Sequence, residues 1–241
     1  MQYPTKSEYV KASQDASDNL DMSTKATDEE LNEAIIDEYG VKYSKDGIKL
    51  LKSPRELDGT YSIKRGTKII CDEAFGRRIS LNHSFLNGLV IPDSVIRIGK
   101  GAFANCSFLR SLVIPDSVTS IGDCAFSGCS SLSNIVIPDS VTSIGDWAFW
   151  GCSSLSNIVI PDSVTSIGDW VFSGCSSLSN IVIPDSVTSI GAWAFSGCSS
   201  LSSLVIPDGV TSIGDGAFKD CNFPDNLKHE LISRFGDKIF W

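Results

Sequence analysis

The sequence predicts a repeat solenoid, in which short coils of chain stack along one axis, and three features support this prediction. An Ile-Pro pair recurs every 23 residues, first at Ile91 and last at Ile206. An internal period of this size is typical of solenoids. Each copy also carries a strand-like run that ends at the proline, which has no N–H for a ladder. One coil cannot bury its own apolar side, so the copies must stack.

Each copy contains the same local elements in the same order. In residues 157–160, Ile158 and Ile160 alternate with Val159 at the period of a strand, and the isoleucines are predicted to face the core. Residues 164–167 form a second strand-like piece. Gly168 follows, and a glycine there predicts a positive φ or a close backbone approach. Residues 169–172 predict a helical or 3₁₀ turn that carries the chain back towards the next strand.

The repeated pattern I-P-x-x-V-x-x-I-G-x-x-A-F-x-x-C-x-x-L resembles the leucine-rich repeats of BspA-like surface proteins, from Ile63 to about Cys221. The resemblance implies a curved, right-handed solenoid. Parallel strands would line its concave face, short 3₁₀ or helical turns its convex face, and helical caps its ends. It also implies adhesion or binding to a protein, the matrix or a host surface, rather than catalysis. The implied location is secreted or at the cell surface.

The chain before the repeats divides into two predicted regions. Residues 1–26 have no period and many polar side chains, so they predict a flexible tail. Residues 27–62 predict a cap made of a helix and a hairpin. Thr27 and Glu30 form a capping-box pattern, Gly40 is expected to end the helix, and residues 45–47 predict the hairpin turn. The expected apolar face of this helix consists of Leu31, Ala34, Ile35 and Tyr39.

The repeat region is predicted to span residues 63–221. Residues 63–75 match the later copies at their apolar positions, although residues 76–87 are five residues longer than the matching segment and predict a loop. Residues 222–241 predict a C-terminal helical cap, with Pro224 in the first turn and Gly236 at the end. Residues 239–241 extend this cover. The expected apolar stripe consists of Leu227, Leu231, Ile232 and Phe235.

Composition and charge narrow the possible partners. The net charge of −9 and the pI of about 4.7 argue against a nucleic-acid backbone as partner. No apolar run approaches the ~18 residues of a membrane span, and residues 1–20 lack the apolar core of a signal peptide.

Six of the eight cysteines share one repeat position, where we expect buried thiols that pack as small apolar groups. A disulfide framework and a metal stack are the alternatives. The six are Cys106, Cys129, Cys152, Cys175, Cys198 and Cys221.

No residue pattern predicts catalysis or a cofactor. His83 and His229 lie outside the regular copies, and no triad, phosphate loop or zinc motif occurs. An aspartate follows each Ile-Pro pair, which predicts a turn, with Ca²⁺ binding as the alternative. A threonine column is expected to fill the solvent side of the second strand. The aspartates are Asp93, Asp116, Asp139, Asp162, Asp185 and Asp208, and the threonines are Thr119, Thr142, Thr165, Thr188 and Thr211.

Two functional hypotheses follow. The first is a binding module for a protein partner, which uses the outward residues of the concave strands. The second is a structural or self-associating protein, a monomer or weak homodimer that pairs through an aromatic patch on the convex face. Shielding of the coil junctions is the other interpretation of that patch. The concave residues are Ser111, Val113, Asn134, Val136, Asn157, Val159, Asn180, Val182, Ser203 and Val205. The patch residues are Trp147, Trp150, Trp170 and Trp193.

Overall fold

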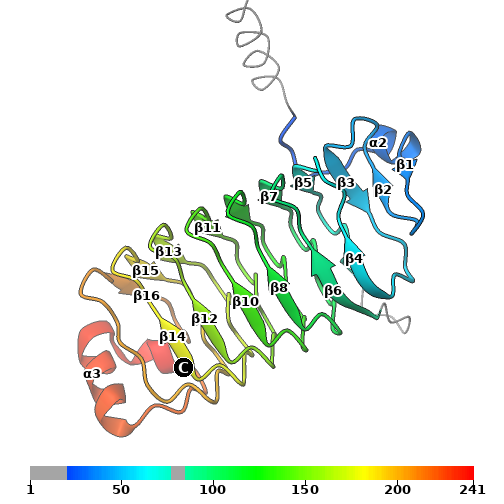
Figure 1. The fold of residues 1–241 in the computed structure, drawn as a ribbon. Coiled ribbons are helices and arrows are strands. Elements are labelled where there is room, and N and C mark those ends of the chain that lie inside the picture. Colours follow the sequence, from blue (N-terminus) through cyan, green and yellow to red (C-terminus); the bar gives the residue numbers. More distant parts are fainter. Residues whose placement is uncertain (1–20, 77–84) are drawn as a thin grey trace, which may run out of the picture.

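A computed structural model describes residues 21–76 and 85–241 and confirms the predicted solenoid (Figure 1). Similar coils stack along one axis, and the chain passes through two strands in most coils. Neighbouring coils pair in parallel and in register, so that Ile158 lies opposite Ile181 and Ile167 opposite Ile190. These partners are 23 residues apart, because each coil uses one copy of the repeat.

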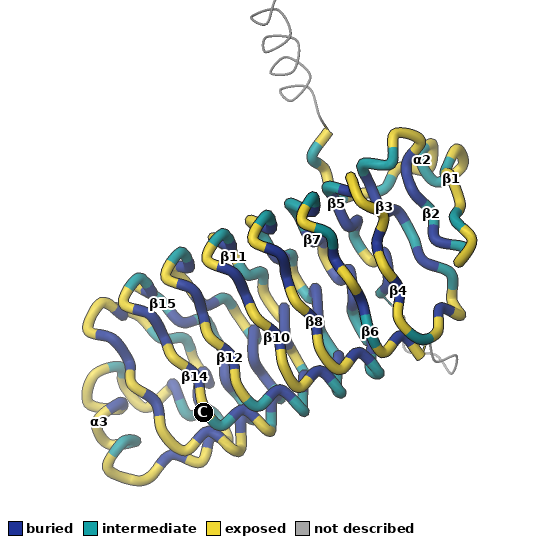
Figure 2. The backbone as a smooth tube through the Cα atoms, in the orientation of Figure 1, coloured by how far each residue is buried: buried dark blue, intermediate teal, exposed yellow. Residues whose placement is uncertain are grey.

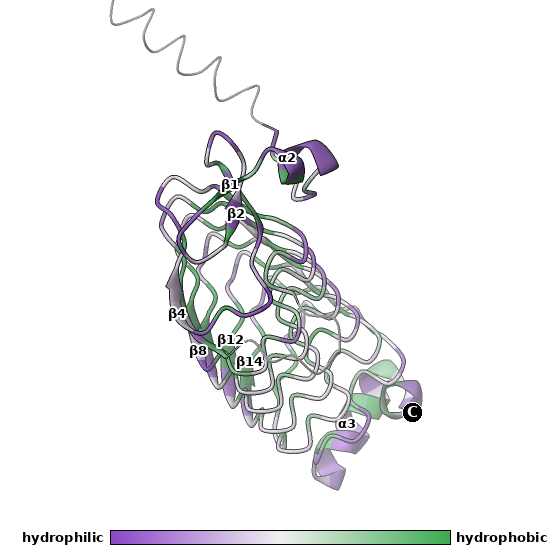
Figure 3. Ribbon diagram, turned by 90° about the vertical axis from the view of Figure 1, so that its right-hand side faces the viewer, coloured by the Kyte–Doolittle hydropathy of each residue, from purple (hydrophilic) through white to green (hydrophobic). Residues whose placement is uncertain are grey.

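The first strand of each coil forms the face that we call the concave face. Along its strands, outward and inward side chains alternate (Figure 2). Viewed from the side, the labelled strands of this face lie in one row (Figure 3). The strands are β4 (Gly59–Ser62), β6 (Leu86–Val90), β8 (Ser111–Val113), β10 (Asn134–Val136), β12 (Asn157–Val159) and β14 (Asn180–Val182).

The second strand of each coil forms a second sheet. Its strands pair in parallel from β3 to β11 and again from β13 to β16, with no pairing between β11 and β13, while the two strands before β3 are antiparallel. Inward side chains such as Val164 and Ile167 are buried. The strands are β1 (Ile35–Ile36), β2 (Lys42–Tyr43), β3 (Lys49–Lys52), β5 (Ile69–Ile70), β7 (Arg97–Ile98), β9 (Ser120–Ile121), β11 (Ser143–Ile144), β13 (Ser166–Ile167), β15 (Ser189–Ile190) and β16 (Ser212–Ile213).

A ladder of phenylalanine rings runs through the core. Each coil from the first full repeat contributes one ring, and consecutive centroids lie 5.2 to 5.7 Å apart. The rings are nearly parallel, and every one is at most 1% exposed. Each coil therefore buries its phenylalanine ring against the rings of its neighbours. The rings belong to Phe75, Phe103, Phe126, Phe149, Phe172, Phe195 and Phe218.

The convex side consists of short turns closed by i→i+3 hydrogen bonds, such as that from Trp150 N to Trp147 O at 3.0 Å. Two residues in each regular repeat have a left-handed backbone, such as Trp147 and Gly151, which keeps these turns from joining into the continuous helical or 3₁₀ turn predicted for residues 169–172. Trp147 has φ 62° and donates its N–H to Asp169 O of the next coil.

The glycine that follows each second strand is explained by the close approach of neighbouring coils, and not by a positive φ. Gly168 does not have a positive φ. A Cβ at this position would instead collide with the Asp146 carboxylate of the preceding coil. The same carboxylate accepts a hydrogen bond from Asp169 N at 2.9 Å. Glycine therefore lets neighbouring coils approach closely at this corner.

The N-terminal cap contains the predicted capping box, but its helix is much shorter than predicted. Helix α2 spans Asp28–Asn32, and Thr27 and Glu30 exchange the expected hydrogen bonds. The sequence prediction of a helix up to Gly40 is wrong, because β1 begins at Ile35 and pairs with β2. Asp37 stabilises the intervening turn, since its Oδ1 accepts hydrogen bonds from two backbone N–H groups. The predicted hairpin between β2 and β3 is confirmed.

The prediction of a flexible tail is wrong for Asp21–Ala26, while residues 1–20 lie outside the described part. Arg97 donates to Met22 O at 2.9 Å, and Asp72 N donates to Thr24 O at 2.8 Å. Met22 and Ala26 also cover apolar side chains that face outward from the first coils, which forms a second small core. The covered residues are Leu51, Ile69 and Cys71. Deleting residues 1–26 is therefore expected to destabilise the protein, whereas deleting an undocked flexible tail would not.

A buried lysine fixes the same segment electrostatically. Lys49 Nζ lies 2.6 Å from Asp21 Oδ2 and 2.9 Å from Glu30 Oε1, and only 5% of its side chain is exposed. Burial lowers the pKa of Lys49, but its hydrogen bonds to the two carboxylates outweigh burial and hold the pKa above its usual value. Removing either carboxylate would leave a poorly solvated cation.

At the C-terminal end, α3 (Asp225–Phe235) follows Pro224 and ends at Gly236, as predicted. A 3₁₀ helix, η1 (Asp237–Phe240), follows it. Leu231 and Ile239 are 1% exposed and pack against the last coil. Ile232 was predicted to share this apolar stripe, but it faces solvent with 37% exposure because it lies one residue beyond Leu231 on the helix. Leu227 and Phe235 are partly buried.

The disguised first repeat is confirmed, because Ile63, Ile70, Ala74 and Phe75 are all buried. Its strand β4 pairs in parallel with β6. The longer segment predicted to loop out falls mainly on residues 77–84, which lie outside the described part together with His83.

Candidate functional site: the concave face

The concave face presents two parallel rows of exposed side chains. All ten residues predicted to point outward from its strands are exposed. Ser203 and Val205 belong to the coil after β14, where these positions are not in a strand. The valines of one row range from 57% exposed at Val136 to 82% at Val205. Five neighbouring coils therefore present one apolar side chain each. Soluble proteins rarely expose a contiguous apolar strip of this kind without a partner.

The second row consists of asparagines with a serine at either end. Asn180 Nδ2 donates to Asn157 Oδ1 of the preceding coil at 3.3 Å, so these amides are aligned along the axis. The serines beside them are directed differently, because Ser179 Oγ donates to Ser156 O. Asn157 and Asn180 also donate to the hydroxyls of Ser156 and Ser179, so this row offers a partner mainly its amide oxygens, each of which can accept two hydrogen bonds.

The aspartate column forms the border of this face beyond the prolines. All six carboxylates are exposed, and none of the ion pairs in the described part of the chain includes one. The neighbouring serines link consecutive coils, as Ser140 Oγ does by donating to Val118 O of the preceding coil at 2.7 Å. Within residues 21–76 and 85–241, no cluster of acidic, cysteine or histidine side chains is arranged to hold a metal.

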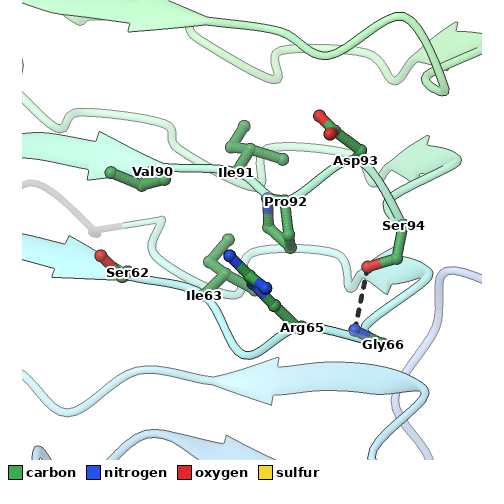
Figure 4. Close-up of a pocket in the computed structure, with 9 residues that line it drawn as sticks. All are labelled: Ser62, Ile63, Arg65, Gly66, Val90, Ile91, Pro92, Asp93 and Ser94. Carbon is green, nitrogen blue, oxygen red and sulfur yellow. Dashed lines mark hydrogen bonds between the residues drawn. The ribbon is translucent and has the colours of Figure 1, made fainter.

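A hollow of about 700 Å³ lies where the first two coils meet at this border (Figure 4). Asp93 lines it, and so does Val90, which is 53% exposed and stands at the position of the valine row in this coil. Arg65 stands where the later coils have aspartate, and sequence reasoning did not single it out. The signal was present in the sequence, because Lys64-Arg65 replaces Pro-Asp in the first copy.

The tryptophan row lies on the convex side, as predicted. The Trp147 and Trp170 rings stack with centroids 4.7 Å apart, and Trp170 and Trp193 stack at 5.0 Å. Lys219 Nζ lies 5.0 Å from the centroid of the Trp193 ring. Trp147 and Trp150 remain 37% and 41% exposed. The faces of the tryptophan rings thus largely contact one another, and the ring edges form the surface.

The cysteine column occupies small inward sites, as predicted. Cys175 Sγ, for example, donates to Phe149 O at 3.2 Å, and the other column thiols make the equivalent bond. Burial raises the pKa of Cys152 to about 12. Cys124 lies outside the column, in the tryptophan position, and is only half-buried.

These thiols are expected to react slowly with a labelling reagent in the native protein, because the reactive thiolate is disfavoured and access is blocked. Cys124 is expected to react first, and the remaining seven only after denaturation. Mass spectrometry of labelled protein with and without denaturant measures both numbers. Three or four disulfides in the native protein would contradict the buried-thiol interpretation.

The stacked coils, with parallel strands and an inward ladder of leucine, isoleucine and phenylalanine, define a leucine-rich-repeat solenoid. The sequence profile of the BspA type leucine rich repeat region matches residues 68–177 and 96–225. The chain belongs to this family of BspA-type leucine-rich repeat proteins.

Solved structures of bacterial leucine-rich repeat proteins have the same fold. A protein from Eubacterium ventriosum is 27% identical with a TM-score of 0.70, and the match covers 80% of this chain. It covers 51% of that protein, so this chain spans about half its length. The T. pallidum leucine-rich repeat protein is 28% identical with a TM-score of 0.69, and the match covers 87% of this chain and 95% of that one. Among curated proteins, none matches this chain.

Among the described residues, no helix has the length and apolar character needed to cross a bilayer.

Proposed function

We propose that this chain is a non-enzymatic binding module that holds a protein partner, such as a matrix or host-surface protein, on its concave face. The observation that carries this proposal is the row of five exposed valines beside the aligned asparagines. Side chains repeated at a fixed rise suit an extended partner segment, and the strands beneath them are held in register by the buried core. Membership of a leucine-rich repeat family of surface proteins supports a binding role and a location at the cell surface.

A charge placed in the valine row is expected to abolish partner binding. Val159→Glu buries a carboxylate in any interface formed there, while its side chain points away from the core in the free protein. The free energy of unfolding should therefore change by less than about 1 kcal/mol. Pull-downs from matrix and surface-protein fractions with the wild type and the variant measure the effect.

Thr165→Glu is the matched control, because Thr165 is exposed on the second sheet of the same repeat. Proteins retained by the wild type and the control, but lost by Val159→Glu, assign the site to the concave face. Equal retention by both folded variants would place the site elsewhere.

Self-association through the tryptophan row is the second candidate. The favouring observation is that three consecutive tryptophans occupy left-handed positions where Gly101 and Gly216 stand in other coils. A tryptophan is less suited than glycine to this conformation, so its ring must stabilise the protein or an assembly in another way. Stacking between the tryptophan rings of neighbouring coils is one such contribution, and a dimer contact is the other. Sedimentation at micromolar concentration distinguishes them, because a clean monomer excludes the dimer.

A further inference from the structure

We infer that the segment held on the concave face is a basic amphipathic α-helix lying along the solenoid axis, with its apolar stripe on the valine row and its basic side over the aspartate row. This inference rests on the proposed function and adds the chemical class of the partner.

The order of the rows across the face gives the first part of the argument. Passing along a strand and into its turn, the exposed residues are asparagine or serine, then valine, then aspartate. The apolar row therefore lies between a neutral hydrogen-bonding row and an anionic row. At the junction of the first two coils, Val90 and Asp93 both line one hollow, together with Arg65 (Figure 4). A partner that fits must itself be apolar along one line and cationic beside it.

The spacing of the rows favours a helix over an extended strand. Paired strands are about 4.8 Å apart, so consecutive valines recur at about that interval. The apolar side chains of a helix recur every three or four residues at 1.5 Å each, or about 5.3 Å on average. Alternate side chains of an extended strand recur at about 6.7 Å. A helix laid along the axis therefore keeps roughly one apolar side chain per coil, whereas a strand loses register after two coils.

Charge gives an independent reason for a cationic partner. Six aspartates stand in line at the same interval, and none of them takes part in an ion pair within the described residues. Neighbouring carboxylates repel one another, and lysine or arginine side chains of a bound helix would relieve this repulsion. The chain as a whole carries a net charge of −9, which also favours encounter with a basic segment.

The test uses three synthetic 18-residue peptides. The first contains leucine and lysine in a helical pattern, the second has the same composition in strict alternation, and the third is the helical pattern with glutamate in place of lysine. Fluorescence anisotropy measures the dissociation constants, and circular dichroism measures helix formed on binding. Each peptide is titrated against the wild type and three triple variants, all checked for an unchanged melting temperature.

The first triple variant, Val136→Ser/Val159→Ser/Val182→Ser, removes the apolar row. The second, Asp139→Asn/Asp162→Asn/Asp185→Asn, removes half of the carboxylates. The control, Glu29→Gln/Glu38→Gln/Asp237→Asn, makes the same change in net charge with exposed residues at the ends of the chain.

We expect only the first peptide to bind the wild type tightly, with a gain of helix. Both face variants should weaken its binding at least tenfold, and the end variant less than twofold. Tighter binding of the alternating peptide, or equal weakening by the end variant, would overturn the inference.

The two proposals fail separately. If Val159→Glu loses its natural partners while the helical peptide binds every variant equally, the concave site stands and the helical partner is wrong. If Val159→Glu retains all its partners, the concave site itself is wrong.

Discussion

Deleting Pro224–Trp241 is expected to make the last coil fray or the protein aggregate, because this segment covers the open end of the solenoid core. Leu231 and Ile239 are 1% exposed. Each such side chain contributes about 1.5–3 kcal/mol when fully buried. The deletion also removes hydrogen bonds from Phe218 N to Ile239 O and from Gly216 N to Lys238 O. The total loss is comparable with the ~5–15 kcal/mol that stabilises a whole domain. Thermal unfolding by circular dichroism, together with sedimentation, measures the effect.

Two neighbouring positions on α3 provide a matched comparison. Leu231→Ala should destabilise the protein by about 2–5 kcal/mol, because its side chain is buried in the last coil. Ile232→Ala should have little effect, since this residue faces solvent. A truncated protein that remains soluble with an unchanged melting temperature would show that residues 222–241 are not the cap.

The repeat could be predicted from the sequence because one coil repeats the same apolar positions many times. Ile158, Phe172 and Cys175 were each placed inward from their spacing, and the structure buries all of them. Outward positions followed from the same alternation, which is why the exposure of the valine and asparagine rows was also predicted. Each assignment rests on several copies of the same position, so a single ambiguous residue does not change it.

The chain outside the repeat could not be predicted as well, because its contacts are not repeated. Leu31, Ala34, Ile35 and Tyr39 fit a helical period, yet the turn formed by Asp37 and the pairing of β1 with β2 override it. The docking of Asp21–Ala26 depends on the outward apolar residues Ile69 and Cys71. The polar sequence of this segment does not indicate that it will pack on an apolar surface, because that surface forms only in the folded coils.

Backbone conformation was the other feature hidden from the sequence. A left-handed position is normally signalled by glycine or asparagine. Glycine marks one left-handed position in most repeats, as at Gly151 and Gly174, but tryptophan occupies the other in three coils, where the sequence carries no such signal. Similarly, the identity of a binding face follows from exposure and spacing, whereas the partner depends on side chains that belong to another molecule.

Phe149→Ala is expected to destabilise the protein by about 3–5 kcal/mol, because it creates a cavity in the middle of the phenylalanine ladder. Phe149 is fully buried between Phe126 and Phe172, at centroid distances of 5.4 and 5.6 Å. Coils are coupled only to their neighbours, so a weakened central coil should also divide the unfolding transition into two parts. Urea unfolding followed by circular dichroism measures both the midpoint and the steepness. Trp150→Ala in the same coil is the control, because this ring is 41% exposed and should cost much less. Equal loss in the two variants, or a transition as steep as that of the wild type for Phe149→Ala, would contradict a core built from nearest-neighbour stacking.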